Sequence, residues 1–172
     1  MLPDLPRYRI VLAKEDFKFS AAHFTLFGGG RAELLHGHNY QVQVELTGRE
    51  LAGEGLLADL ESCKRTLRAL CARLDSRTLL PAASERLRCT RRGDVVEARL
   101  GERCYTFPAA DTLLLPLVNT SMELLARMLW HELAAELRAS RVELLAVSVE
   151  ESSGQRCLYE DRITAGSPDP SS

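Results

Sequence analysis

The segment from residue 36 to residue 46 alternates between two kinds of side chain, and this period of two predicts a β-strand. Successive side chains on a strand point to opposite faces. His36 and His38 therefore share a face with the apolar residues that follow, namely Tyr40, Val42, Val44 and Leu46. The polar residues Asn39, Gln41, Gln43 and Glu45 lie on the other face. The strand thus begins with two imidazoles that extend a core-facing row.

A third histidine, His23, ends another strand-like run over residues 19–23. Three neutral imidazoles suit zinc, and without a fourth His or Cys nearby one position stays open, which is the pattern of catalytic zinc sites. The same ligands also accept iron, cobalt or nickel. An isolated His-x-His pair more often lies on a surface or in a satisfied core, so the histidines need context before they predict a metal site.

The composition excludes several classes of protein. A chain of 172 residues suits one domain, which we expect over residues 1–165, with a disordered tail over residues 166–172. The net charge of −2, with both signs interspersed, argues against nucleic acid or a membrane as the main partner. Five cysteines without a Cys-x-x-Cys pair argue against a disulfide framework. No apolar run has the length of a signal peptide or a membrane span, so we expect a cytoplasmic protein.

Hydrophobic periodicity predicts an α+β chain. The expected elements are strands over residues 9–19 and 36–47, a helix over residues 59–75, short strands over residues 86–90, 95–100 and 103–107, a helix over residues 120–137, and a strand over residues 141–151. Asp59 is placed to cap the first helix. Thr120 and Glu123 have the spacing of a capping box at the start of the second. Glu151 ends the apolar inner row of the last strand.

Six motifs occur in the order and approximate spacing of one known family. They are Phe19-Ser20-Ala21-Ala22-His23, Leu35-His36-Gly37-His38-Asn39-Tyr40, Gly55-Leu56-Leu57-Ala58-Asp59-Leu60, Leu74-Asp75, Asn119-Thr120-Ser121-Met122-Glu123 and Val147-Ser148-Val149-Glu150-Glu151-Ser152. Over most of residues 8–160 the chain resembles the 6-pyruvoyl-tetrahydropterin synthase family. This family includes 6-carboxy-tetrahydropterin synthases and a folate-pathway branch that makes 6-hydroxymethyl-dihydropterin. Several motifs together are more specific than any one.

The resemblance implies a tunnelling fold, in which a four-stranded antiparallel sheet carries two helices on one face, here with a short hairpin insertion. It also implies homotrimers, usually stacked as hexamers, with active sites between subunits. His23, His36 and His38 would be the zinc ligands. Glu151 would anchor the pterin, because a carboxylate can accept two parallel hydrogen bonds from the amide edge of the ring. Ser121 and Glu123 would lie near the pterin, although the capping-box spacing explains Glu123 equally well.

Two departures from the family pattern bear on the chemistry. The usual cysteine before His-Gly-His is missing, since residues 1–62 contain no cysteine, and cysteine chemistry is excluded. Glu33 stands three residues before His36 instead, which resembles the glutamate variant of the folate branch. The second departure is Ser76. The family has Leu-Asp-His where this chain has Leu74-Asp75-Ser76, so the imidazole that Asp75 would orient as a proton relay is absent.

The resulting hypothesis is a zinc-dependent lyase that converts 7,8-dihydroneopterin, or its triphosphate, to 6-hydroxymethyl-7,8-dihydropterin by retro-aldol cleavage. Glu33 is the expected base and Asp75 the second catalytic residue. One alternative is the 6-pyruvoyl or the 6-carboxy reaction, both of which normally use the missing cysteine and histidine. Another is a non-catalytic oligomer that binds zinc and pterin, which would account for Ser76. His131, the remaining histidine, is expected to be a structural or surface residue rather than a relocated base.

Overall fold

The computed structural model describes residues 7–164, and its largest feature is a seven-stranded sheet. The strands are β1 (Tyr8–Leu12), β2 (Lys18–His23), β3 (His36–Gly48), β4 (Arg77–Pro81), β8 (Thr112–Leu115), β9 (Leu144–Ser152) and β10 (Gln155–Arg162). Their order is β10-β9-β3-β2-β4-β8, and β1 also pairs with β3. From β10 to β2 the strands are antiparallel, whereas β4 and β8 are parallel additions. The predicted four-stranded antiparallel sheet is confirmed as the strands β10-β9-β3-β2 of this wider sheet.

The strand predicted over residues 9–19 is wrong as a single element, because a turn divides it into β1 and β2. Both strands pair with β3, so they occupy one edge of it in succession. Within the turn, the backbone N–H of Phe17 donates to the carbonyl of Lys14 over 3.1 Å. The Phe17 side chain is fully buried. The turn therefore allows an aromatic ring to enter the core before the second strand starts.

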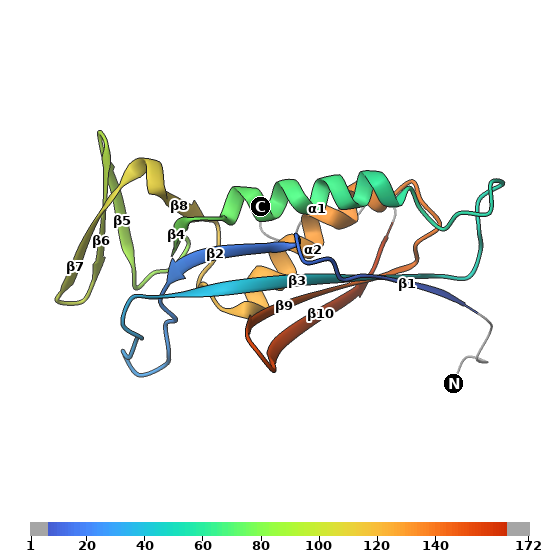
Figure 1. Ribbon diagram of the computed structural model, residues 1–172. Coiled ribbons are helices and arrows are strands. Elements are labelled where there is room, and N and C mark those ends of the chain that lie inside the picture. Colours follow the sequence, from blue (N-terminus) through green and yellow to red (C-terminus); the bar gives the residue numbers. More distant parts are fainter. Residues whose placement is uncertain (1–6, 165–172) are drawn as a thin grey trace.

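Two helices lie on one face of the sheet, as predicted (Figure 1). They are α1 (Leu60–Leu74) and α2 (Met122–Leu137). Asp59 caps α1 as expected, since its carboxylate accepts hydrogen bonds from the backbone N–H groups of Glu61 and Ser62 over 3.0 and 3.3 Å. The helices follow their predicted spans closely because each has a continuous apolar face.

The capping box predicted for Thr120 and Glu123 is wrong. The N-cap of α2 is Ser121, and its side chain makes no capping hydrogen bond. Thr120 is fully buried, and its hydroxyl donates to the carbonyl of Phe24 over 3.2 Å. A tertiary contact with the segment after β2 thus uses the hydroxyl that a capping box would need.

The larger hydrophobic core lies between the helices and the sheet. Its fully buried members include Phe17, Tyr40, Val42, Val44, Leu46, Leu67, Leu74, Leu79, Leu125, Leu129, Leu133, Leu145, Val147 and Val149. Burying one such side chain stabilises the fold by about 1.5–3 kcal/mol. The indole N–H of Trp130 also donates to the carbonyl of Leu145 over 2.8 Å, which ties α2 to β9.

The predicted insertion is a separate three-stranded antiparallel sheet at one end of the molecule (Figure 1). It consists of β5 (Arg88–Arg92), β6 (Val95–Leu100) and β7 (Arg103–Pro108), and the short helix η1 (Ala109–Asp111) follows it. One face of this sheet covers a smaller hydrophobic core, made of Phe24, Leu80, Leu87, Val96, Ala98 and Leu100. The insertion therefore has a core of its own rather than being a simple hairpin.

The cysteines agree with the expectation that no disulfide framework exists, because all five are free. Cys63 and Cys71 are buried on α1, and burial raises the pKa of their thiols to about 11 and about 12. Within residues 7–164, neither helix combines the length and the apolar composition needed to span a bilayer. The tail predicted over residues 166–172 lies outside the described residues.

Candidate metal centre

Two neighbouring strands bring three histidines to the same end of the main sheet. In the register of β2 and β3, His23 lies opposite His36, and Ala21 lies opposite His38. The ring centroids of His23 and His36 are 4.8 Å apart, and those of His36 and His38 are 4.7 Å apart. The alternation of the strand places all three imidazoles on one face. The residues predicted as ligands are thus gathered by backbone pairing alone.

Glu151, at the end of β9, joins this cluster. Its Oε1 atom lies 2.9 Å from Nε2 of His23 and 3.2 Å from Nε2 of His38. The four residues offer ligand atoms that all lie within 4.8 Å of one another, so they could hold a metal ion. The hydroxyl of Tyr40 also donates to Oε1 of Glu151 over 3.1 Å. Sequence reasoning placed Glu151 on the inner face but did not place it beside the histidines.

Register explains this position of Glu151. Val149 lies opposite Val42 in the pairing of β9 with β3, so two residues further along Glu151 comes level with Tyr40. The two faces could be assigned from alternation, but which residues face each other across two strands depends on a pairing that the sequence alone does not specify. Only that pairing brings a carboxylate from residue 151 to imidazoles from residues 23 and 38.

Backbone carbonyls fix the orientation of two imidazoles. Nδ1 of His23 donates to the carbonyl of Thr120 over 2.9 Å, and Nδ1 of His36 donates to the carbonyl of Leu34 over 2.8 Å. A carbonyl can only accept, so in the neutral rings the lone pairs lie on Nε2. Such second contacts are typical of metal-binding histidines. Nε2 of His23 then faces the Glu151 carboxylate, another acceptor, and a cation between them would satisfy both.

The charge states within the cluster favour metal binding. Burial lowers the pKa of His23 below its ordinary value, even though the nearby Glu151 carboxylate opposes this shift. His23 is therefore neutral at pH 7, which is the form that binds a metal. Burial, together with the charge of Glu151, raises the pKa of Tyr40 and keeps its phenol protonated. Three nitrogens and one carboxylate oxygen form a donor set that fits zinc.

Glu33 lies at the edge of this cluster, in the loop between β2 and β3. One of its oxygens, Oε2, is 3.8 Å from Nε2 of His36 and accepts a hydrogen bond from the backbone N–H of Thr25 over 2.9 Å. Partial burial opposes ionisation, but hydrogen bonding to Thr25 and the neighbouring imidazoles outweigh it and lower the pKa of Glu33. The side chain is therefore a carboxylate at neutral pH, ready to accept a proton.

Asp75 occupies a different place. Its Oδ1 accepts from the backbone N–H of Ser20 over 2.7 Å, and its Oδ2 accepts from the hydroxyl of Ser76 over 3.1 Å. Ser76 has a positive φ of 57° and begins the turn into β4. In the part of the chain that the structure describes, Asp75 makes no hydrogen bond or ion pair with the three histidines. A cleft of about 430 Å³ lies beside it, lined by residues that include Ser76 and Asp111.

The remaining predicted site residues lie at the start of α2. Ser121 is the N-cap of the helix, and Glu123 is exposed in its first turn. Thr120, just before them, holds the imidazole of His23, a role that the sequence did not reveal. His131 packs against Trp130 and Tyr159, with ring centroids 5.1 and 6.4 Å away, as expected of a structural residue.

Comparisons with known proteins agree with the fold. A family profile described as 6-pyruvoyl tetrahydropterin synthase matches residues 12–162. A Methanocaldococcus jannaschii protein, provisionally named 6-carboxy-5,6,7,8-tetrahydropterin synthase, is 30% identical over 145 residues, which cover 83% of this chain and 88% of that protein.

Two solved structures from Plasmodium vivax are also similar. The 6-pyruvoyl tetrahydropterin synthase has a TM-score of 0.84 and 28% identity, over 91% of this chain and 99% of that chain. A variant of that synthase, in which a catalytic glutamate is replaced by alanine, has a TM-score of 0.81 with the same identity and coverage. The profile match over most of the residues and the curated relative together show that this chain belongs to the 6-pyruvoyl tetrahydropterin synthase family.

Proposed function

We propose that this protein is a zinc-dependent lyase of pterin biosynthesis that converts 7,8-dihydroneopterin, or its triphosphate, to 6-hydroxymethyl-7,8-dihydropterin. The observation that carries the proposal is the position of Glu33, whose carboxylate lies 3.8 Å from a histidine of the cluster. No cysteine occurs in residues 1–62 to take its place. The Plasmodium vivax variant, described by the loss of a catalytic glutamate, supports a carboxylate as the base in a similar chain.

The reaction balances with one base. Glu33 accepts the proton of the C2′ hydroxyl, the C1′–C2′ bond breaks, and its electron pair moves into the pterin ring. C2′ and C3′ leave as glycolaldehyde, phosphorylated when the substrate is the triphosphate. Return of the proton to C1′ gives the hydroxymethyl product. Bound zinc would supply Lewis acidity toward the side-chain hydroxyls. The hydrogen bond from Thr25 to Glu33 keeps the carboxylate directed and ionised before the reaction.

We assign Glu151 to the pterin as its anchor, with Ser121 and Glu123 close to the ring. The position of Glu151 beside His23 and His38 favours a second role as a metal ligand. Glu151→Gln separates the two roles. An anchor that loses its charge raises KM while the metal content stays unchanged, whereas a lost ligand lowers the metal affinity itself. Metal content by atomic spectroscopy after dialysis, measured beside KM, distinguishes these results.

We further propose a cytoplasmic homotrimer or hexamer with active sites between subunits. This assembly is what the family resemblance implies. Within residues 7–164, Asp75 makes no hydrogen bond or ion pair with Glu33 or the three histidines, and a site between subunits would combine these groups from different chains. Sedimentation velocity of the metal-loaded protein tests the assembly.

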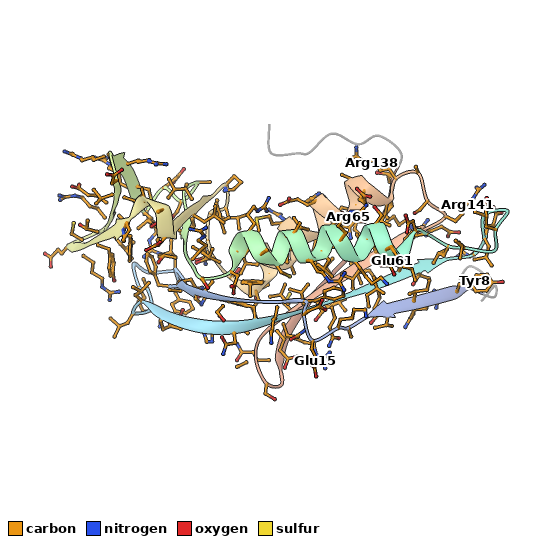
Figure 2. The ribbon with its side chains drawn as sticks, turned by 45° about the horizontal axis from the view of Figure 1, so that its top comes forward. Tyr8, Glu15, Glu61, Arg65, Arg138 and Arg141 are labelled. Carbon is orange, nitrogen blue, oxygen red and sulfur yellow. The ribbon has the colours of Figure 1, made fainter. Side chains whose placement is uncertain are left out.

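The decisive experiment incubates the zinc-loaded protein with 7,8-dihydroneopterin and, separately, with its triphosphate. The pterin products are oxidised and separated by chromatography, and glycolaldehyde is measured in parallel. We expect hydroxymethylpterin in equal amounts with glycolaldehyde, or with phosphorylated glycolaldehyde when the triphosphate is the substrate, and loss of both products in Glu33→Gln and after removal of the metal with a chelator. Glu15→Gln, an exposed glutamate in the turn before β2, is the matched control and should retain full activity (Figure 2).

Two other results would contradict the proposal. Formation of 6-pyruvoyl- or 6-carboxy-tetrahydropterin would favour the reactions after which the family and the archaeal relative are named. Tight pterin binding without any product would favour a non-catalytic zinc- and pterin-binding oligomer. Ser76→His tests that last case, because histidine tolerates the positive φ of this position better than most residues. A large gain in rate would identify an enzyme that has lost its relay.

A further inference from the structure

The loop that carries Glu33 has little structure of its own. It joins His23 to His36 and includes Gly28, Gly29 and Gly30, which are all exposed. Its internal backbone hydrogen bonds are few: the N–H of Phe27 donates to the carbonyl of Arg31, and the N–H of Glu33 donates to the carbonyl of Thr25, both over 3.0 Å. The N–H of Thr25 also donates to Oε2 of Glu33 over 2.9 Å. A glycine-rich, solvent-exposed loop has many accessible conformations. Something outside the loop must therefore hold its backbone if Glu33 is to keep one position.

Asn119, before α2, binds both backbone groups of Leu26 over 2.9 and 3.0 Å, and the insertion sheet with the segment leading into it holds the rest of the loop through two arginines. Nη1 of Arg103, at the start of β7, donates to the carbonyl of Glu33 itself over 2.8 Å and to that of Ala32 over 3.4 Å. Arg86, just before β5, donates from Nη1 to the carbonyl of Phe27 over 2.5 Å and from Nη2 to that of Arg31 over 3.0 Å. The two guanidinium groups thus bind both arms of the loop.

Apolar packing adds to these hydrogen bonds. Tyr105 of β7 stacks on Phe24, with ring centroids 5.5 Å apart. Phe24 is almost fully buried and directly follows His23. Leu26 and Ala32, which pair across the base of the loop, also pack against the smaller core. The insertion therefore contacts the loop at its start, at its turn and at Glu33.

We propose that the β5–β7 insertion positions Glu33 for catalysis, with Arg103 and Arg86 as its positioning residues. This inference rests on the proposed role of Glu33 as the base. Arg103 holds the peptide carbonyl of Glu33, so it fixes where the Cα–Cβ bond of that residue points relative to His36. A displacement of about 1 Å can lower the rate of a proton transfer by about 100-fold. The insertion acts through the backbone of the loop, and within the described residues no hydrogen bond or ion pair joins it to the histidines or Glu151.

We expect the two arginines to respond differently to replacement by lysine. Both bonds of Arg103 come from a single nitrogen, so one ammonium group can replace them. Arg86 uses two nitrogens to reach carbonyls four residues apart, and an ammonium group cannot reproduce that fork. We expect Arg103→Ala to lower kcat about 10- to 100-fold with little change in KM, and Arg103→Lys to recover most of the loss. Arg86→Ala and Arg86→Lys should both stay impaired.

The matched control is Arg99→Ala. Arg99 lies on β6 of the same sheet, directly opposite Arg88, and on the face that points away from the loop. Figure 2 shows nitrogen-tipped side chains extending from this end of the molecule into solvent. The control variant should keep kcat, metal content and thermal stability. Equal losses in Arg99→Ala and Arg103→Ala would overturn the proposal, because they would indicate general damage to the insertion.

Amide hydrogen exchange supplies a readout that does not depend on turnover. Arg103→Ala should accelerate exchange at the N–H groups of Phe27 and Glu33 roughly fivefold, with no change in the strand amides of β3. Unchanged exchange and unchanged kcat in Arg103→Ala, with Glu33→Gln inactive, would overturn the positioning role. A fully active Glu33→Gln would instead remove the proposed base, and the exchange result would still decide whether the insertion orders the loop.

Discussion

The two hydrophobic cores of this protein have different relations to the histidine cluster. The larger core holds the sheet against α1 and α2, and it reaches the cluster through Tyr40, which stacks on Phe19 and contacts His23. The smaller core lies under the insertion and reaches the cluster through Phe24. Ligand positions therefore depend on the pairing and packing of strands, whereas the position of Glu33 depends on a loop held from the side.

This difference indicates how one fold can support several reactions. The histidines sit on paired strands, where a shift of one would disturb the whole sheet. Glu33 sits on a loop outside the strands that carry the histidines, so its chemistry can change without disturbing the metal ligands. Changes in the larger core should therefore affect stability, and changes in the smaller core should affect activity. The following predictions test that separation.

The largest effect on stability is expected for Leu129→Ala in the larger core. Leu129 is fully buried, and its truncation should lower the free energy of unfolding by about 2–5 kcal/mol. The activity of the remaining folded protein should be unchanged, because Leu129 belongs to the larger core on α2 and is not a residue of the cluster. Urea denaturation and kcat per bound zinc measure the two quantities. Leu56→Ala, at a side chain that is 56% exposed, serves as the control and should change neither.

Gly48→Ala should have the next largest effect, again on stability alone. A Cβ at this position would lie 2.3 Å from the carbonyl oxygen of Arg141 and 2.6 Å from the Leu57 side chain. One of these neighbours must move, which should lower stability by about 1–3 kcal/mol. Gly53→Ala meets no atom within 4 Å and should be neutral. Similar melting temperatures for the two variants would show that the loop around residue 141 yields more easily than we infer.

The sequence predicted elements well where the signal was local. The alternation after His36 indicated β3 and the face that carries two ligands, and Asp59 marked the start of α1. β10 escaped prediction because an edge strand can be charged and polar, as Arg156, Glu160 and Asp161 are here. β4 and β8 are short apolar runs whose strand character comes from their parallel partners. Local sequence patterns identify which side chains share a face of a strand, whereas the pairing of strands depends on the whole chain.

The candidate site also has a part that local sequence patterns predict and a part that depends on contacts across the whole chain. Its histidines follow from parity and from the family motifs, and the structure brings them together. Three other contacts join residues far apart in sequence. Glu151 pairs with His23, the carbonyl of Thr120 accepts a hydrogen bond from the same imidazole, and Arg103 donates to the carbonyl of Glu33. No periodicity encodes such contacts. Thr120 shows the consequence, since its hydroxyl does not cap α2 but donates to the carbonyl of Phe24, and its own carbonyl accepts from Nδ1 of His23.

Tyr105→Leu tests whether a change in the smaller core affects activity more than stability. Loss of the stacking on Phe24 should cost only about 0.5–1.5 kcal/mol of stability. Because Phe24 lies between His23 and the loop, we expect kcat to fall several-fold although the protein is more stable than Leu129→Ala. Steady-state kinetics at saturating substrate, with thermal denaturation, give both values. A variant with normal kcat and a large loss of stability would contradict the assignment of the smaller core to the site.

The smallest effect concerns Asp75 and depends on pH. The backbone N–H of Ser20 lowers the pKa of Asp75 below its ordinary value of 3.8, with a further contribution from Ser76. The folded state thus favours the carboxylate. The resulting stability is fully present above about pH 4 and is lost as the pH falls through the lowered pKa. Since Asp75 is largely exposed, we expect Asp75→Asn to lower the free energy of unfolding by less than about 1 kcal/mol at pH 7. In urea titrations the two proteins should become equally stable once the pH lies below the lowered pKa of Asp75, because both side chains are then uncharged. A difference that persists there would mean that the contact between α1 and β2 depends on shape rather than on charge.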